Sequence, residues 1–229
     1  MDYQDGTYLE NNPTWHAEHS DWKAENIVRI LSQCDVRPRR ICEIGCGAGG
    51  VLAEVAKRLP DARELHGYDI SPQAHELCAK RDDGDARLHY HLADLLEVDA
   101  HFDVVLAIDV FEHVEDCFGF LRRLRAKGDV KVFHIPLDVS VLSVLHGHMM
   151  QRRTSVGHIH YFTRDTALAL LADTGYRVEA SFYTPGGYKF LRRNPKGVLK
   201  AAMARTAEAI DPHFAARLMG GYSLMVLAR

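Results

Sequence analysis

Three closely spaced glycines and two carboxylates further along the chain have the clearest potential for chemistry. Gly45, Gly47 and Gly49 lie in the stretch ICEIGCGAGG, between an apolar run and a helical pattern. Glycines there let a ligand approach the backbone, and the free amides at the start of the following helix then face that ligand. Asp69 and Asp94 end the next two apolar runs, where a carboxylate can accept the hydroxyls of a ribose. The pattern indicates a site for a nucleoside-containing cofactor, although the glycine spacing alone also fits the dinucleotide fingerprint GxGxxG.

The segments around these residues separate a dehydrogenase from another class of enzyme. A dehydrogenase needs neither the second acid nor Glu43, which precedes the first glycine. Taken together, EIGCGAG, YDIS, LAD and the later FDVVLAIDVFEHVED resemble the class I S-adenosylmethionine (SAM)-dependent methyltransferases, in their small-molecule branch. The resemblance covers residues 38–182 and implies transfer of the SAM methyl group to a small molecule, with oxygen as the expected acceptor atom. The alternatives are an N- or C-methyltransferase, an RNA ribose 2′-O-methyltransferase with a divalent metal, and a SAM-binding module without catalysis.

The resemblance also implies roles for individual residues. Glu43 is expected to hold the glycine loop and the methionine amino group, Asp69 the ribose hydroxyls, and Asp94 the adenine amino group. The full set of implied cofactor-binding residues is Glu43, Gly45, Cys46, Gly47, Gly49, Asp69, Ile70, Ala93, Asp94, Leu95 and Asp109.

Two histidines are candidates for catalysis. His113 directly follows the fourth predicted strand, and an imidazole can act as a general base near neutral pH. A second interpretation comes from the small-RNA 3′-terminal ribose methyltransferases, in which an E-x-x-E-H segment and a later histidine hold a divalent cation. By that resemblance Asp109, Glu112, His113 and His158 would bind Mg²⁺ or another divalent cation, and His158 would share in catalysis. The structural alternative is that Glu112 caps a helix and His113 packs against the core.

Alternating strands and helices must position these residues. Strands are predicted at residues 40–44, 64–69, 87–92, 102–108, 131–135, 176–182 and 222–228, and helices near 49–59, 72–81, 112–126 and 164–174. Such alternation gives a parallel sheet with helices on both faces. We therefore expect an α/β Rossmann-like methyltransferase fold, with a seven-stranded, mostly parallel sheet and an antiparallel last strand.

Three segments outside this alternation are expected to cover the site. Residues 1–38 form a predicted helical lid, with a helix capped by Thr14, ahead of a methyltransferase domain at 39–229. Inserts at 137–163 and 184–221 interrupt that domain. The second contains a predicted helix at 197–210 and is either a cap for the acceptor or an oligomer contact. The expected substrate-contacting residues are Tyr8, Trp15, His160 and Tyr161.

Composition limits the classes of partner. The chain has 229 residues, of which 47% are apolar and 26% charged, and this suits one α/β domain. A net charge of −3 makes nucleic acid an unlikely partner. Five cysteines without a CxxC pair predict reduced thiols and a cytoplasmic location. No long apolar run or signal peptide is visible, so we expect no membrane partner, and a homodimer is left open.

Overall fold

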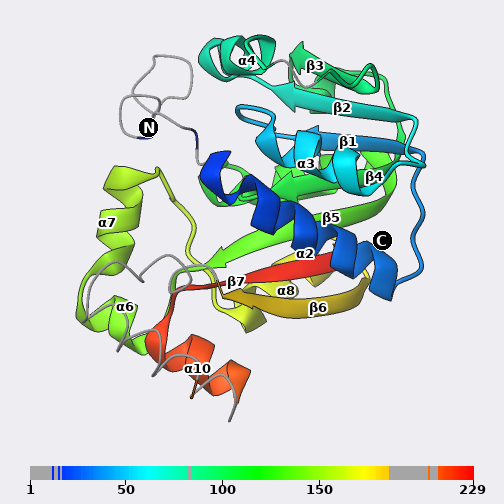
Figure 1. The fold of residues 1–229 in the computed structure, drawn as a ribbon. Coiled ribbons are helices and arrows are strands. Elements are labelled where there is room, and N and C mark those ends of the chain that lie inside the picture. Colours follow the sequence, from blue (N-terminus) through cyan, green and yellow to red (C-terminus); the bar gives the residue numbers. More distant parts are fainter. Residues whose placement is uncertain (1–11, 13–14, 16, 82–83, 186–205, 207–210) are drawn as a thin grey trace.

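The computed structural model describes residues 12, 15, 17–81, 84–185, 206 and 211–229. In that part of the chain a seven-stranded sheet lies between two layers of helices (Figure 1). The strands are β1 (Arg40–Ile44), β2 (Glu64–Asp69), β3 (Leu88–Leu92), β4 (Phe102–Ile108), β5 (Gly128–Leu137), β6 (Val178–Pro185) and β7 (Tyr222–Ala228).

The strand order is β3-β2-β1-β4-β5-β7-β6. Neighbours from β3 to β5 pair in parallel, and β7 runs antiparallel between β5 and β6. The predicted fold class is therefore confirmed. The order in which successive strands are added reverses between β1 and β4, which are themselves parallel. The carboxyl ends of these two strands therefore flank the crevice in which such sheets bind ligands.

Apolar residues on both faces of the central strands explain why helices cover both sides. Val104 and Leu106 of β4 pack with the helices α2 and α3, while Val105 and Ala107 pack with α5 and α8 on the opposite face. These helices are α2 (Ser20–Gln33), α3 (Gly50–Arg58), α5 (Cys117–Leu124) and α8 (Arg164–Asp173), and α4 (Pro72–Ala79) follows β2.

A smaller group of helices lies beyond the carboxyl end of β5 (Figure 1). It contains α6 (Val141–Leu145) and α7 (His148–Ser155) from the first predicted insert, and α10 (Pro212–Met219) from the second. Helix α10 packs against α6. Segments far apart in sequence therefore form one wall at the end of the sheet.

The predicted starting residues of two helices were wrong. Residues 112–126 do not form one helix, because a 3₁₀ turn, η3 (Phe111–His113), precedes α5. Helix α5 is capped by Asp116, whose side chain accepts from Gly119 N, so Glu112 does not cap it. Helix α2 begins at Ser20, after the short η1 (Ala17–His19). Thr14, Tyr8 and the predicted helix at 197–210 lie outside the described residues.

Among the described helices, none is long and apolar enough to cross a membrane. The predicted cytoplasmic location and the possible homodimer stay predictions.

Candidate functional site

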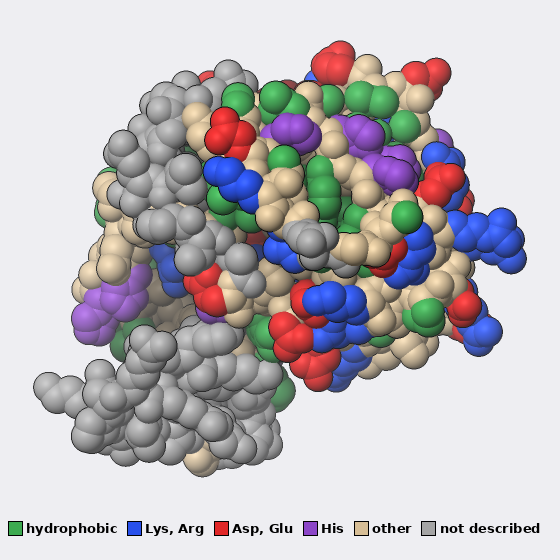
Figure 2. Space-filling model, turned by 45° about the horizontal axis from the view of Figure 1, so that its top comes forward, with side chains coloured by type: hydrophobic (Ala, Val, Ile, Leu, Met, Phe, Trp, Pro, Cys, Tyr) green, Lys and Arg blue, Asp and Glu red, His purple; other side chains and the backbone are tan. Residues whose placement is uncertain are grey.

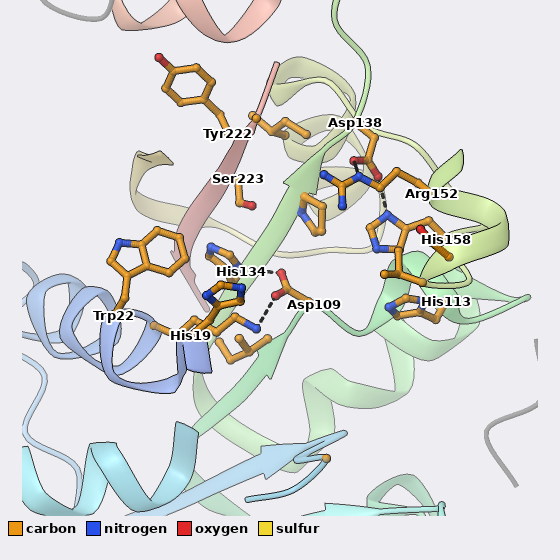
Figure 3. A pocket seen from close by; sticks show the side chains of 18 of the residues that line it. His19, Trp22, Asp109, His113, His134, Asp138, Arg152, His158, Tyr222 and Ser223 are labelled. Atoms are coloured by element: carbon orange, nitrogen blue, oxygen red, sulfur yellow. Dashed lines mark hydrogen bonds and ion pairs between the residues drawn. The ribbon is translucent and has the colours of Figure 1, made fainter. Parts of the chain in front are cut away.

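A cavity of about 830 Å³ opens where the carboxyl ends of β1, β4 and β5 meet helix α2 and the α6–α7 wall (Figure 3). One side is lined by the glycine loop at residues 45–50, and the opposite side by residues of the first insert. Two groups of polar side chains face each other across it. Asp109 and His134 lie on one side, and Asp138 and His158 on the other.

The glycine loop is shaped by a positive-φ backbone and tight packing. Gly47 has a φ of +53°, and a Cβ there would lie 2.4 Å from the indole of Trp15. Gly49 has a φ of +72°, and a Cβ there would lie 2.6 Å from the ring of Tyr90. Neither position tolerates a side chain without strain. The loop therefore keeps its backbone close to the cavity, and Trp15 lines the cavity beside it.

Asp69 holds this loop in place. Its carboxylate accepts from Gly47 N at 2.8 Å and from Ser71 N at 2.9 Å. Burial raises the pKa of Asp69, and the bonds from the backbone amides oppose that rise. The structure thus shows Asp69 as an anchor of the glycine loop, and its predicted bond to a ribose stays a prediction.

Glu43 is a buried carboxylate that lines the cavity. Burial raises its pKa to about 8, although the nearby Lys23 opposes the shift. Its Oε2 atom has no hydrogen-bond partner among the described residues. An unpaired buried carboxylate oxygen is costly unless a ligand supplies a donor. The ammonium group of a SAM methionine moiety is such a donor, so the residues present fit this cofactor.

Asp109 belongs to a chain of charged and polar groups. Its carboxylate contacts Lys23 Nζ at 2.7 Å and His134 Nδ1 at 2.6 Å, and His134 Nε2 lies 2.9 Å from Thr184 Oγ1. Although burial opposes it, electrostatic interactions and hydrogen bonds with His134 and Lys23 hold the pKa of Asp109 well below its usual value. Asp109 has a φ of +57°, which is strained for a residue with a side chain. The backbone here turns the carboxylate toward α2 and β5.

Glu112, His113 and His158 form a separate cluster, in which one ligand atom from each residue lies within 4.8 Å of the others. Glu112 is fully buried, and neither of its carboxylate oxygens has a hydrogen-bond partner among the described residues. His113 Nε2 lies 3.8 Å from Glu112 Oε1. The structure therefore gathers three of the four predicted metal ligands. It corrects the fourth, because Asp109 pairs with Lys23 and His134 instead.

Both imidazoles of this cluster are held through Nδ1. His113 Nδ1 lies 3.2 Å from Gly157 O, and His158 Nδ1 lies 2.5 Å from Asp138 Oδ2. Arg152 Nε lies 3.6 Å from the other oxygen of Asp138. Burial and the neighbouring His158 lower the pKa of His113 to about 4, so His113 is neutral near physiological pH. Burial and the charge of Asp109 raise the pKa of Glu112 well above its usual value.

The remaining predicted residues occupy varied surroundings. Asp94 caps the 3₁₀ turn η2 (Leu95–Glu97), since its side chain accepts from Leu96 N at 2.8 Å. Ala93 is half-buried and Leu95 fully buried beside it. The side chain of Ile70 is 49% exposed. The predicted adenine contacts stay predictions.

His160 and Tyr161 are not among the residues that line the cavity. His160 Nε2 lies 2.9 Å from Val114 O, and the hydroxyl of Tyr161 is buried without a hydrogen-bond partner among the described residues. The positions of His160 and Tyr161 therefore do not favour the predicted contact with the substrate. The sequence interpretation missed several residues that line the cavity. One of them, Asp138, could have been found, because it directly follows β5 and ligands bind at the carboxyl ends of such strands. The others are Lys23, Trp22, His134 and Arg152.

A family model described as a methyltransferase domain matches residues 15–181. The chain belongs to this family. Among its relatives, ajmaline N-methyltransferase of Rauvolfia serpentina is 27% identical over 211 residues, which cover 85% of this chain and 66% of that protein. Ubiquinone biosynthesis O-methyltransferase of Neisseria meningitidis serogroup C (strain 053442) is 33% identical over 133 residues, 51% of this chain and 52% of that protein. The chain thus spans about half to two thirds of the length of these curated relatives.

Solved methyltransferases share the fold. Magnesium protoporphyrin IX methyltransferase (ChlM) from Synechocystis PCC 6803, with bound S-adenosylhomocysteine (SAH), has a TM-score of 0.62 at 16% identity and covers 100% of this chain and 89% of its own. N-methyltransferase NodS from Bradyrhizobium japonicum WM9, in complex with SAH, has a TM-score of 0.58 at 16% identity, covering 98% and 91%. Both are methyltransferases, so the predicted family is confirmed on fold as well as sequence.

Proposed function

We propose that this chain binds SAM and catalyses methyl transfer to a small-molecule acceptor. One observation carries the proposal. The glycine loop and Glu43, whose buried Oε2 atom is unpaired among the described residues, line the same cavity as the polar groups of the α6–α7 wall. SAM supplies an activated methyl group on a sulfonium sulfur. The chain must then hold the cofactor on one side of the cavity and the acceptor on the other.

Four groups suit the cofactor half. Glu43 would accept from the methionine ammonium, and Lys23 would offer a positive charge for the methionine carboxylate. Ile70 and Leu92 are each 49% exposed, and the bond from Ala93 N to Asp69 O brings their two segments together at 3.0 Å. A flat apolar adenine would cover these two side chains and remove them from water.

The acceptor half is formed by the inserts. His146, Arg152 and His158 line it from the first insert, Met219 lines it from the second, and Tyr222 and Ser223 line it from the start of β7. These side chains would place the acceptor atom about 3 Å from the methyl carbon and keep water out. His113 and His158 remain the candidates to take a proton. Oxygen stays the expected acceptor atom, with nitrogen as the alternative, because the relatives include both O- and N-methyltransferases.

The surface favours a small acceptor over nucleic acid. On the face shown in Figure 2, positive and negative side chains are interspersed, and the whole chain has a net charge of −3. Such a surface offers no strong attraction to a phosphate backbone.

A divalent cation is a second proposal, and it concerns a cluster of three residues, of which His113 and His158 line the same cavity. Glu112, His113 and His158 offer one carboxylate and two imidazoles, a donor set that suits a divalent ion such as Mn²⁺ or Zn²⁺. The observation in its favour is Glu112, whose two buried oxygens have no other described partner. A cation held by these residues would lower the pKa of an acceptor hydroxyl, and this would favour oxygen as the acceptor atom.

The experiment joins binding with transfer. Calorimetric titration with SAH tests the cofactor site, and incubation with methyl-labelled SAM and fractionated cell metabolites tests transfer. We expect SAH binding and label in a small molecule. Label in RNA would support the ribose methyltransferase instead. A folded chain that binds neither SAM nor SAH would overturn the proposal.

A further inference from the structure

Two thiols meet beneath the glycine loop. Cys46 lies in the loop itself and Cys78 on α4, and both side chains are buried. Both are also directed at the same acceptor, with Cys78 Sγ 3.1 Å and Cys46 Sγ 3.9 Å from Gly47 O. On the adjacent strand β2, Gly67 leaves the necessary room, since a Cβ there would lie 2.8 Å from Cys46 Sγ. Both sulfurs therefore lie within 4 Å of the same backbone oxygen, in a buried space beneath the loop.

The two sulfurs differ in access. Cys46 is among the residues that line the cavity, although only 8% of it is exposed, whereas Cys78 is 3% exposed and sits behind it. A small oxidant that enters the cavity therefore reaches Cys46 first. Cys78, which is directed at the same backbone oxygen, is then the resolving thiol.

We propose that Cys46 and Cys78 form a reversible disulfide in response to hydroperoxides, and that this disulfide weakens cofactor binding by the glycine loop. Hydrogen peroxide transfers one oxygen atom to the Cys46 thiol. This gives a sulfenic acid at Cys46 and releases one water. The Cys78 sulfur then attacks the Cys46 sulfur, an S–S bond forms, and a second water leaves. Two thiols lose two electrons and two protons in total, and a dithiol reductant returns them. The effect on binding rests on the proposed function, but the disulfide itself does not.

The consequence for the loop follows from the hydrogen bonds. In the reduced state Gly47 O accepts from the two thiols, and Gly47 N donates to Asp69. A disulfide has no S–H group, so Gly47 O loses these donors on oxidation. The sulfurs must also approach to about 2.05 Å, which moves Cys46 toward α4. Both changes act on the peptide unit that lines the cofactor side of the cavity.

The rate of the reaction is limited by the same contacts. The hydrogen bond to Cys78 and burial raise the pKa of the Cys46 thiol well above its usual value. Thiolate is scarce under these conditions, and a thiol reacts slowly with peroxide when it is protonated. The pair therefore responds to sustained oxidant rather than to a brief pulse. A ligand in the cavity should slow the reaction further by covering Cys46.

The experiment uses the full chain exposed to hydrogen peroxide, with and without SAH, and analysed by intact mass, peptide mapping and SAH titration. We expect a loss of two hydrogens, a Cys46–Cys78 cross-linked peptide, and SAH affinity weakened about tenfold. Dithiothreitol should restore both mass and affinity, and bound SAH should delay the cross-link.

Two variants separate this pair from other thiols. Cys78→Ser keeps a hydroxyl donor near Gly47 O and should show neither the mass loss nor the peroxide-induced loss of affinity. Cys34→Ser, at a half-buried thiol on the C-cap of α2, should behave as the wild type does. Absence of the cross-link in the wild type, or a cross-link with unchanged SAH affinity, would overturn the proposal. A chain that binds no SAH even when reduced contradicts the proposed function instead, and peptide mapping still decides whether the disulfide forms.

Discussion

The amide of Gly47 donates to the carboxylate of Asp69 at 2.8 Å, which ties the glycine loop to the end of β2. The two residues are 22 positions apart, yet both belong to the part of the site that the sequence already indicated. The bond makes the conformation of the loop depend on one ionised side chain. Asp69 also accepts from Ser71 N, so the same carboxylate fixes the start of α4.

Replacement of Asp69 by asparagine should therefore weaken cofactor binding. The amide group cannot accept from two backbone amides with the strength of a carboxylate, and we expect SAH affinity to fall about tenfold or more. Calorimetric titration measures this. Asp103→Asn is a matched control, because Asp103 accepts from Arg39 N at 2.7 Å and Arg40 N at 2.9 Å near the amino end of the sheet. Equal loss of SAH affinity in both variants would contradict the prediction.

The stability of the ligand-free chain should depend on Glu43. Its pKa is about 8 in the folded state, above the 4.5 of an exposed glutamate. Because the pKa is raised on folding, Glu43 contributes to the free energy of unfolding through its protonated form. This contribution is complete below pH 4.5 and is lost as the pH rises through about 8. Glu43→Gln should remove this loss, on the order of 2–4 kcal/mol between the two limits. Urea unfolding of both proteins from pH 5 to about 9 tests it, and parallel pH curves would show the prediction to be wrong.

The pairing of Lys23 with Asp109 should matter for folding. Asp109→Ala leaves Lys23 largely buried without its direct ion pair, and we expect a loss of about 3–5 kcal/mol in the free energy of unfolding. The double variant Lys23→Met/Asp109→Leu removes both charges and should lose less. Denaturant unfolding at neutral pH compares the two. A double variant less stable than Asp109→Ala would rule out this account.

The proposed cation can be tested without activity. We expect the chain to bind Mn²⁺ or Zn²⁺ in equilibrium dialysis, and Glu112→Gln and His158→Ala to abolish that binding. Asp138→Asn should weaken it about 10–100-fold, since Asp138 orients the His158 ring. His160→Gln is the matched control, because His160 is bonded to the backbone at Val114 and lies outside the cluster. Absence of binding in the wild type, or equal binding by Glu112→Gln, would remove the cation from the mechanism.

The parts of the fold that depend on local patterns could be predicted from the sequence. The strand at residues 102–108 was found at its observed bounds because an unbroken apolar run is typical of a central parallel strand. The segment after it was harder. A helix was expected from residue 112. Instead Asp109 has a φ of +57°, and the α-helix begins only after its cap at Asp116. A single left-handed residue leaves no periodic signal.

The candidate site was predictable mainly where a sequence motif marks it. Glu43, Gly47 and Asp69 were identified by motif, and the structure brings Gly47 and Asp69 into contact. Asp109 was assigned to the wrong group because its partner Lys23 comes from α2, and no spacing in the sequence relates the two. His134 was not predicted as a site residue, because it lies in the interior of β5. Its Nδ1 contacts the carboxylate of Asp109 there. Tertiary packing alone decides such contacts.

The walls of the cavity have different origins in the chain. Gly45, Cys46 and Gly47 line one side and come from the loop that joins the first strand and helix of the sheet. Leu142, Arg152 and Met219 line the other and come from segments that add no strand to it. Helices α6 and α10 pack against each other. We therefore expect substitutions of these insert residues to disturb the sheet little. On the proposed function, substitutions in these insert residues would change the acceptor that this chain takes and leave the residues of the glycine loop unchanged.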